Sequence, residues 1–305
     1  MFDQVNIPDE FITEKISWEE IKKIFGKFSD QWIFRGQSND SIPESILYRN
    51  EKCLNYGSEE ERAINDFKNE IDKYPGVECS PVTKVDWLCL MRHYGYPSRI
   101  LDWTSCPYIA TFFAFKEDKI NSGAPVVWAV NKDWLKYWAI RRIKTIEKYI
   151  NCTETDLTTD ECFNDIFIFN NDYLNFVYPF LPSSNISKSG RISKQKSVFL
   201  CPGNPIRDFM TNLCCEFSSQ NNINREISDG LISQFTDEKN KYIYKLRINI
   251  EDKDKIINDL KNKNITEHSL SLNPHSLDEA GKKFKEMALK RDEYWRNWLS
   301  EEINI

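Results

Sequence analysis

The sequence predicts an α+β fold built as a single domain over residues 1–305. Apolar residues recur at helical spacing in several segments that begin with capping residues, whereas residues 124–130 and 242–248 carry the β-branched and aromatic side chains typical of buried strands. No internal repeat and no Gly/Ser-rich linker divides the chain. Helices and strands are therefore expected to share one core.

The first elements should place an arginine at the end of a strand. After an extended lead-in over 1–15, Ser17 and Glu20 form a capping-box pattern that begins a helix, which should stop within 26–29. Residues 31–35 read as a short strand, and Gly36 is expected to let the backbone turn into a loop. Arg35 would then lie at a strand end beside this loop, where ligand groups are often held.

Two more helices and a second strand follow. Ser58 should cap a helix that ends before Pro75, and a third helix is expected over 83–93. Residues 99–103 read as a strand, and Pro107 suits the first turn of the next helix. Thr104 or Ser105 should cap that helix, whose unpaired N–H groups would favour an anion.

The remaining chain divides by pattern into three regions. Residues 16–130 hold the motif core, and 131–190 read as a mostly helical or irregular insertion that begins with a basic helical segment over 133–149. Residues 191–305 should supply closing strands and C-terminal helices, with helices expected over 253–261 and 277–299.

Composition excludes several classes of protein. A net charge of −6 and a pI near 5.4 argue against non-specific binding to a phosphate backbone. Nine cysteines at irregular spacing and an N-terminus without a signal pattern favour a reducing cytoplasm. No apolar run reaches the roughly 20 residues that span a bilayer, and the three histidines make a structural metal site unexpected.

Two windows carry polar residues among aromatics that look buried. They are residues 32–37 and 90–116, and the second contains His93, Asp102 and Thr104. Polar groups in such surroundings must be paired or used, because burying them unpaired costs free energy.

These windows resemble a known family. The combination WIFRGQ followed by RHYGYPSRILDWTSCPYIATFFAF resembles the FRG domain, a family named for its Phe-Arg-Gly motif and found mostly in bacteria and their mobile elements. Residues 191–199 look like the family's later Arg…Gln…Val-Phe strand, and residues 270–274 match more weakly.

The same residues look similar to the Arg, Ser-Thr-Ser and Glu/Gln series of ADP-ribosyltransferases. This resemblance implies a split mixed or antiparallel sheet with flanking helices and a cleft that takes NAD as substrate. Arg35 would hold the NAD diphosphate, Thr104 and Ser105 would shape the nicotinamide-ribose pocket, and Tyr94 or Trp103 would stack on the nicotinamide. The candidate catalytic residues are Arg35, His93, Asp102 and Gln195, and the candidate NAD-binding residues are Arg35, Gln37, Tyr94, Arg99, Thr104 and Ser105.

The sequence departs from the transferase pattern at one position. Gln195 stands where the catalytic Glu is expected, and an amide can orient a ribose hydroxyl but supplies no negative charge. Glu216 or Glu226 could substitute from a neighbouring loop.

The resemblance favours an ADP-ribosyltransferase-like effector, a toxin or anti-phage defence protein that modifies a nucleic acid or protein and is held by an antitoxin or partner. The alternative is a non-catalytic nucleotide- or protein-binding module of a defence system. A nucleic-acid module would instead use the basic residues of 141–148. In structural terms, Arg35 could simply pair with Asp102 and fix strand against strand. A nucleophile elbow, a P-loop and a G-x-G-x-x-G fingerprint are all absent from the sequence.

Overall fold

A computed structural model describes the part of the chain that carries the FRG-like motifs. The described residues are 15–41, 43, 56–71, 81–93, 96, 98–116, 124–151, 153, 155–156, 159, 162, 166–167, 174–181, 190–204, 207, 209–214, 242–270 and 286. Tyr94, Glu216 and Glu226 lie outside them, as do the helices expected over 277–299 apart from residue 286.

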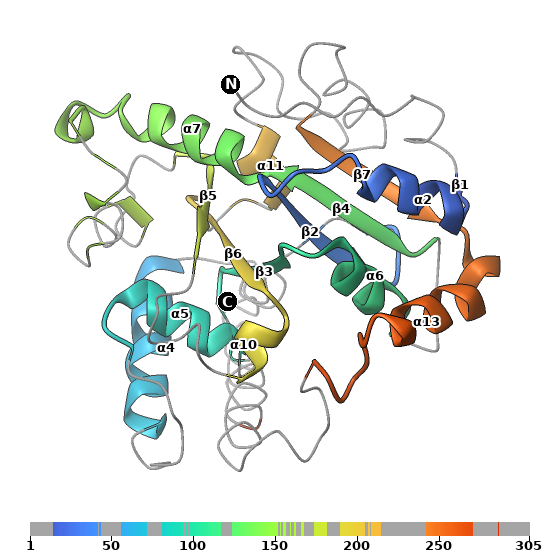
Figure 1. Cartoon of the computed structure of the whole chain (residues 1–305). Helices are drawn as coiled ribbons and strands as arrows, with labels where there is room; N and C mark the ends of the chain where they lie inside the picture. The colour runs from blue at the N-terminus through green and yellow to red at the C-terminus, as the bar shows by residue number, and fades with distance from the viewer. Residues whose placement is uncertain are drawn as a thin grey trace, which may run out of the picture.

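The fold is α+β, as predicted, and its centre is a seven-stranded mixed sheet with the strand order β1-β7-β4-β2-β3-β6-β5 (Figure 1). Only β1 and β7 pair in parallel among the described strands, and every other neighbouring pair is antiparallel. The strands are β1 (Lys15–Ile16), β2 (Trp32–Gln37), β3 (Leu101–Thr104), β4 (Val126–Asn131), β5 (Val177–Phe180), β6 (Ser197–Pro202) and β7 (Ile243–Ile248).

The sheet narrows sharply between β2 and β3. Strand β2 pairs with β4 along its whole length, and β3 pairs with β6 along its whole length. In contrast, β2 and β3 share the single register pair Phe34 and Thr104. The sheet therefore consists of two halves that meet at one residue pair and diverge beyond it.

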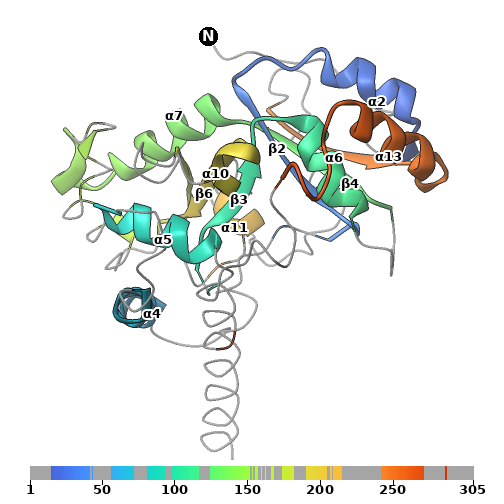
Figure 2. The same ribbon diagram turned by 60° about the horizontal axis from the view of Figure 1, so that its bottom comes forward.

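The described residues form eight α-helices (Figures 1 and 2). They are α2 (Trp18–Phe25), α4 (Tyr56–Ile71), α5 (Lys84–His93), α6 (Pro107–Phe115), α7 (Lys132–Ile143), α10 (Gly190–Lys194), α11 (Phe209–Cys214) and α13 (Lys253–Asn262), with 3₁₀ turns at η1 (Glu147–Tyr149) and η4 (Ile250–Asp252). Helix α4 packs against α5 and not directly on the sheet. Helices α2, α6 and α13 lie together beside the β4–β7 half in both views.

Alternating side chains of the strands build the core on both faces of the sheet. In β4, Val127 and Ala129 pack with α2, α6 and α13, whereas Val126, Trp128 and Val130 pack with α7 and α11. Every residue of β4 is buried, so both faces of this central strand are covered.

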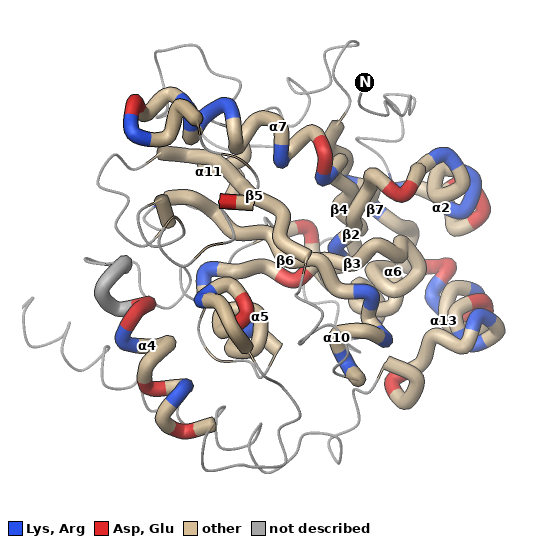
Figure 3. Tube along the Cα trace, turned by 60° about the vertical axis from the view of Figure 1, so that its left-hand side comes forward, with Lys and Arg blue, Asp and Glu red and all other residues tan. Residues whose placement is uncertain are grey.

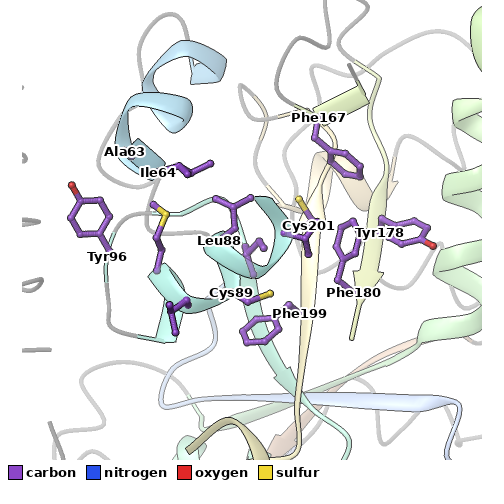
Figure 4. Packing of buried hydrophobic residues seen from close by; sticks show 14 of the residues in the cluster. Ala63, Ile64, Leu88, Cys89, Tyr96, Phe167, Tyr178, Phe180, Phe199 and Cys201 are labelled. Carbon is purple, nitrogen blue, oxygen red and sulfur yellow. The ribbon is translucent and has the colours of Figure 1, made fainter. Parts of the chain in front are cut away.

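A further cluster joins the other half of the sheet to α4 and α5. Figure 4 shows Leu88 and Cys89 of α5 beside Phe199 and Cys201 of β6. All four side chains are buried, so α5 packs firmly against β6. Helix α5 precedes Asp102 in the chain, and β6 follows Gln195.

Two predicted helix caps differ from the structure. Helix α2 does begin after Ser17, but the Ser17 hydroxyl donates to the Glu20 carboxylate at 2.7 Å instead of accepting from a backbone N–H. Helix α4 begins at Tyr56, so Ser58 lies inside the helix and the predicted cap is wrong. The two residues that precede the serine in the helix, Tyr56 and Gly57, have modest and low helix propensity, so local preference does not predict this earlier start.

The expected turn at Gly36 is also wrong. Gly36 lies within β2, which continues to Gln37. A Cβ atom at this position would lie 1.7 Å from the carbonyl oxygen of Ala110 and 2.8 Å from the backbone nitrogen of Ala114, both in α6. The glycine is therefore required for the close approach of a helix to a strand. Arg35 consequently lies inside a strand and not at its end.

The strand expected over 191–199 is helical in its first half. Arg191 lies in the short helix α10, and Lys196 then turns the chain with a positive φ of 48°. Strand β6 begins at Ser197. Gln195 is therefore a turn residue at the entrance to β6.

Charged residues lie mostly on the outer helices (Figure 3). Helices α2, α7 and α13 carry both signs of charge, whereas α6 has no charged residue from Pro107 to Phe115. Within the described residues, no helix has the length and apolarity that crossing a bilayer requires.

Candidate functional site

A cleft opens where the two halves of the sheet diverge. Its volume is about 460 Å³, and its walls come from the last residues of β2, the loop that follows β2, strand β3, helix α6 and the start of β6. The lining residues are Phe34, Arg35, Gly36, Gln37, Ser38, Asn39, Ser41, Arg92, Asp102, Trp103, Thr104, Ala110, Phe113, Lys116, Gln195 and Ser197. Residues that are far apart in the sequence thus meet at the junction of β2 and β3.

An ion-pair cluster spans the divergence between the strands. Arg35 of β2 donates through Nη1 to the Asp102 carboxylate at 2.9 Å and to the Asp102 backbone carbonyl at 2.6 Å. Arg92 of α5 donates to the same carboxylate oxygen through Nε at 2.8 Å and Nη2 at 2.5 Å. The structural pairing expected for Arg35 is therefore confirmed, and its guanidinium replaces a ladder hydrogen bond where the strands separate.

The two guanidinium groups keep Asp102 ionised. Desolvation within the cleft acts to raise the pKa of Asp102, but the charges of Arg92 and Arg35, and their hydrogen bonds, outweigh it and hold the pKa well below its usual range. The Asp102 side chain is 42 % exposed, whereas those of Arg35 and Arg92 are 14 % and 17 % exposed. A permanent negative charge therefore faces the cleft.

The cleft is nevertheless positive on balance. Among its lining residues, Arg35, Arg92 and Lys116 are cationic, and Asp102 is the carboxylate that opposes them. Walls of low dielectric strengthen the attraction of such a site for an anion. The loop from Ser38 to Ser41 adds hydroxyl and amide groups to one side of the cleft.

Two ion pairs anchor that loop to the sheet. The Asp40 carboxylate forms ion pairs with Lys245 Nζ at 2.6 Å and with Arg247 Nε at 3.1 Å, and both partners lie on β7. Lys245 is almost fully buried and also donates to the Asp40 backbone carbonyl. Ser38, Asn39 and Ser41 are therefore carried on a loop with a fixed centre.

Thr104 and Gln195 lie at the opposite wall. The Thr104 hydroxyl donates to the Gln195 backbone carbonyl at 2.7 Å and accepts from the Cys106 backbone N–H at 3.1 Å. The Gln195 side chain donates to the Leu270 carbonyl at 3.2 Å. Thr104 is thus a bridge between two chain segments, and the amide of Gln195 ties the segment that ends at Leu270 to the cleft.

The predicted caps of α6 are wrong. The N-cap residue is Cys106, which makes no side-chain cap bond. Ser105 is exposed and does not line the cleft, although its backbone N–H donates to the Lys196 carbonyl at 3.0 Å.

His93 and Arg191 form a second tier beside Asp102 and do not line the cleft. Burial first, and then the charge of Arg191, lower the pKa of His93 to about 4, although the charge of Asp102 acts to raise it. Arg191 donates to the His93 backbone carbonyl at 3.5 Å. His93 is therefore neutral at pH 7.

Arg99 lies away from the cleft, although it was expected to bind NAD. Its guanidinium donates to the Glu60 carboxylate at 2.6 Å, and both side chains are buried. Further bonds run from Arg99 to the carbonyls of Pro202 and Gly203. The pair fastens α4 to β6 and serves the core.

The structure therefore brings Arg35, Gln37, Asp102, Thr104 and Gln195 together, and leaves His93, Arg99 and Ser105 outside the cleft. Sequence reasoning missed Arg92, Lys116 and Ser197 as lining residues. Arg92 could have been predicted, because it precedes His93 at the end of a helix that runs toward Asp102. In the described part of the chain, no group of three or more His, Cys, Asp and Glu side chains could hold a metal ion.

Comparisons with known proteins identify one region of the chain. The family model of the FRG domain matches residues 30–122. No curated protein matches the chain, and no solved structure matches it. The matched region contains the arginine pair, Asp102 and Thr104, whereas Gln195 and Ser197 lie beyond it. The β2 to α6 side of the cleft, with the glycine that admits α6 to the sheet, therefore lies within the region that matches the FRG domain.

Proposed function

We propose that the cleft binds NAD and that the protein is an NAD-dependent ADP-ribosyltransferase-like effector. The order of the strands is the observation that best supports this proposal. Neighbouring strands β2, β3 and β6 bring an arginine, a hydroxyl residue and a glutamine to one cleft, in that order. The register pairs Phe34 with Thr104 and Thr104 with Ser197, so these positions lie side by side across the sheet.

The charge of the cleft suits the diphosphate of NAD. Planar guanidinium groups bind phosphate oxygens through paired hydrogen bonds, and Lys116 adds a third cation. Phe113 is a half-buried aromatic residue of the same cleft, and a nicotinamide or adenine ring can pack beside it, whereas Phe34 and Trp103 are buried in the core. Raising the salt concentration should weaken nucleotide binding, because ions screen this attraction.

In the proposed reaction, the bond between the ribose carbon and the nicotinamide nitrogen breaks, and its electron pair leaves with nicotinamide. The ribose then carries an oxocarbenium-like positive charge until a hydroxyl or amine of the acceptor attacks it and loses a proton. A nearby negative charge stabilises this state most effectively. Asp102 is the carboxylate among the lining residues, so we assign it this role, while Gln195 orients a hydroxyl.

One observation favours a second candidate, a non-catalytic nucleotide- or protein-binding FRG module. Arg35 and Arg92 offset the negative charge of Asp102, and Gln195 has no charge. A cleft of this kind can hold an anion without cleaving it. Both candidates share the same ligand site and differ in turnover.

The wider role belongs to the same proposal. In this role the protein acts in the cytoplasm as a toxin or anti-phage defence protein. It modifies an RNA, DNA or protein acceptor, and an antitoxin or other partner protein binds it. The support for this part is the FRG domain at residues 30–122 together with the resemblance described above.

The test uses NAD labelled in its adenylate phosphate, incubated with separate pools of RNA, DNA and cell protein. Wild type should transfer label or release nicotinamide, and Arg35→Ala should not. Arg141→Ala is the matched control, because Arg141 is an exposed arginine of α7 outside the cleft. Circular dichroism of each variant checks folding, and Arg35→Lys preserves the charge if Arg35→Ala fails to fold. Binding without nicotinamide release would support the non-catalytic module. Absence of NAD binding to the wild type would refute the transferase and leave the non-catalytic module, with another nucleotide or a protein as its ligand.

A further inference from the structure

A second cavity lies between α6 and α13, on the far side of α6 from the cleft. Its volume is about 420 Å³, within the range of about 300–1,000 Å³ that is typical of small-molecule sites. Its apolar lining comes from Phe112 and Phe115 of α6, Ile257 and Leu260 of α13, and Ile265. Figures 1 and 2 both show α6 and α13 side by side.

Cations line the same cavity. Lys116 follows the last turn of α6, and Lys253 and Lys261 lie at the two ends of α13. Glu267 is the carboxylate among the lining residues, so the lysines leave an excess of positive charge. Lys116 and Lys261 are exposed, whereas Phe115 and Leu260 are buried, which separates a charged rim from an apolar floor.

We infer that this cavity is a binding site for a small anion with an apolar body, of the class of medium-chain carboxylates. An apolar chain gains free energy by leaving water for the aromatic and aliphatic floor. The carboxylate would remain at the rim near Lys261, where charge-assisted hydrogen bonds form without burying an ion. A neutral ligand would lose the rim contacts, and a cationic ligand would be repelled.

The site stands apart from the NAD cleft and from the function proposed for it. Lys116 is the residue that lines both cavities among the described residues. The test therefore leaves Lys116 unchanged, so that a failure of NAD binding and a failure of this inference give different results.

The experiment measures binding of octanoate, decanoate and decanol to the full chain by isothermal titration calorimetry. Decanoate should bind at one site, and octanoate should bind roughly 15-fold more weakly, because each buried methylene contributes about fourfold. Decanol should bind at least tenfold more weakly than decanoate, because it lacks the charge that the lysines attract.

Two variants locate the site. Lys261→Glu reverses a rim charge and should weaken decanoate binding at least tenfold, whereas Lys144→Glu, a charge reversal at the exposed C-cap residue of α7, should leave it unchanged. Ile257→Trp fills the cavity from a half-buried position and should abolish binding.

Three results would overturn the inference. They are no decanoate binding to the wild type, decanoate and decanol binding with equal affinity, and equal effects of Lys261→Glu and Lys144→Glu. If Ile257→Trp does not fold, the comparison of the two lysine variants still decides, because both substitutions are at exposed positions.

Discussion

Replacing Asp102 with asparagine removes the negative charge that Arg35 and Arg92 share. The new amide side chain would keep one carbonyl acceptor, but both guanidinium groups would lose their counter-charge. Hydrogen bonds to a charged group contribute about 1.5–3 kcal/mol each, whereas exposed ion pairs contribute about 0.2–1 kcal/mol. Since Asp102 is 42 % exposed but its partners are mostly buried, we expect Asp102→Asn to lower the free energy of unfolding by about 1–3 kcal/mol.

The assay is urea denaturation followed by tryptophan fluorescence at pH 7. The midpoint should fall while the slope with urea stays constant. Asp156→Asn is the control, because the Asp156 side chain is exposed and accepts hydrogen bonds from the neighbouring Thr153. Its effect should stay below about 0.5 kcal/mol.

The pH dependence provides a second check on the same cluster. The pKa of Asp102 is lowered in the folded protein, so its stabilising contribution is fully present above the unfolded pKa of about 3.9. The contribution is lost as the pH falls below that value toward the folded pKa. The difference between wild type and Asp102→Asn should therefore be constant from pH 7 to about 5 and shrink below about 4. Equal stability of the two proteins at pH 7 would refute the reasoning.

Three further predictions concern the fold. Gly36→Ala should destabilise the protein by about 3 kcal/mol or more, because a Cβ would overlap the Ala110 carbonyl oxygen; a urea midpoint within error of wild type would show that α6 can shift freely. Glu60→Gln should cost about 3–5 kcal/mol by leaving the buried Arg99 charge unpaired, measured by the same denaturation, and a loss under 1 kcal/mol would contradict that. As the pH falls from 6.5 to about 4, protonation of His93 in the unfolded chain but not in the folded protein should lower the free energy of unfolding of the wild type by on the order of 2–3 kcal/mol. His93→Gln should lack this part of the pH dependence, and parallel stability curves for both proteins over this range would argue against a neutral His93.

Much of the fold could be predicted from local patterns. The helices at α2, α5, α6 and α13 and the strands at β4 and β7 follow from periodicity and from capping or proline signals near their ends. These segments combine strong local preference with one clear buried face. The strand order could not be predicted, because it depends on which distant strands meet, and no local pattern encodes that.

The errors arose where a distant contact decides the local structure. Gly36 reads as a turn residue in the sequence, but the backbone that requires a glycine there belongs to Ala110, far along the chain. Residues 191–195 carry a pattern that suits either a strand or a short helix. In the structure they form the end of α10 and a turn, and Lys196 separates them from β6. Local propensity is a weak guide in such short segments.

The site was predicted in part for the same reason. Arg35, Asp102, Thr104 and Gln195 do line one cleft. Arg99 was predicted as a ligand residue and Arg92 was missed, but a buried Glu60 pairs with Arg99, and Arg92 lines the cleft. Which of two nearby arginines reaches the cleft depends on the partner that the tertiary structure offers.

The measurement that tests the central claim most directly is calorimetric titration of NAD into the wild type, Arg35→Ala and the control Arg141→Ala. Loss of charged hydrogen bonds to the diphosphate should weaken binding by roughly 10- to 150-fold in Arg35→Ala, while Arg141→Ala should bind as wild type does. Equal affinity of Arg35→Ala and wild type, or no binding by the wild type, would contradict an NAD site at the divergence of β2 and β3.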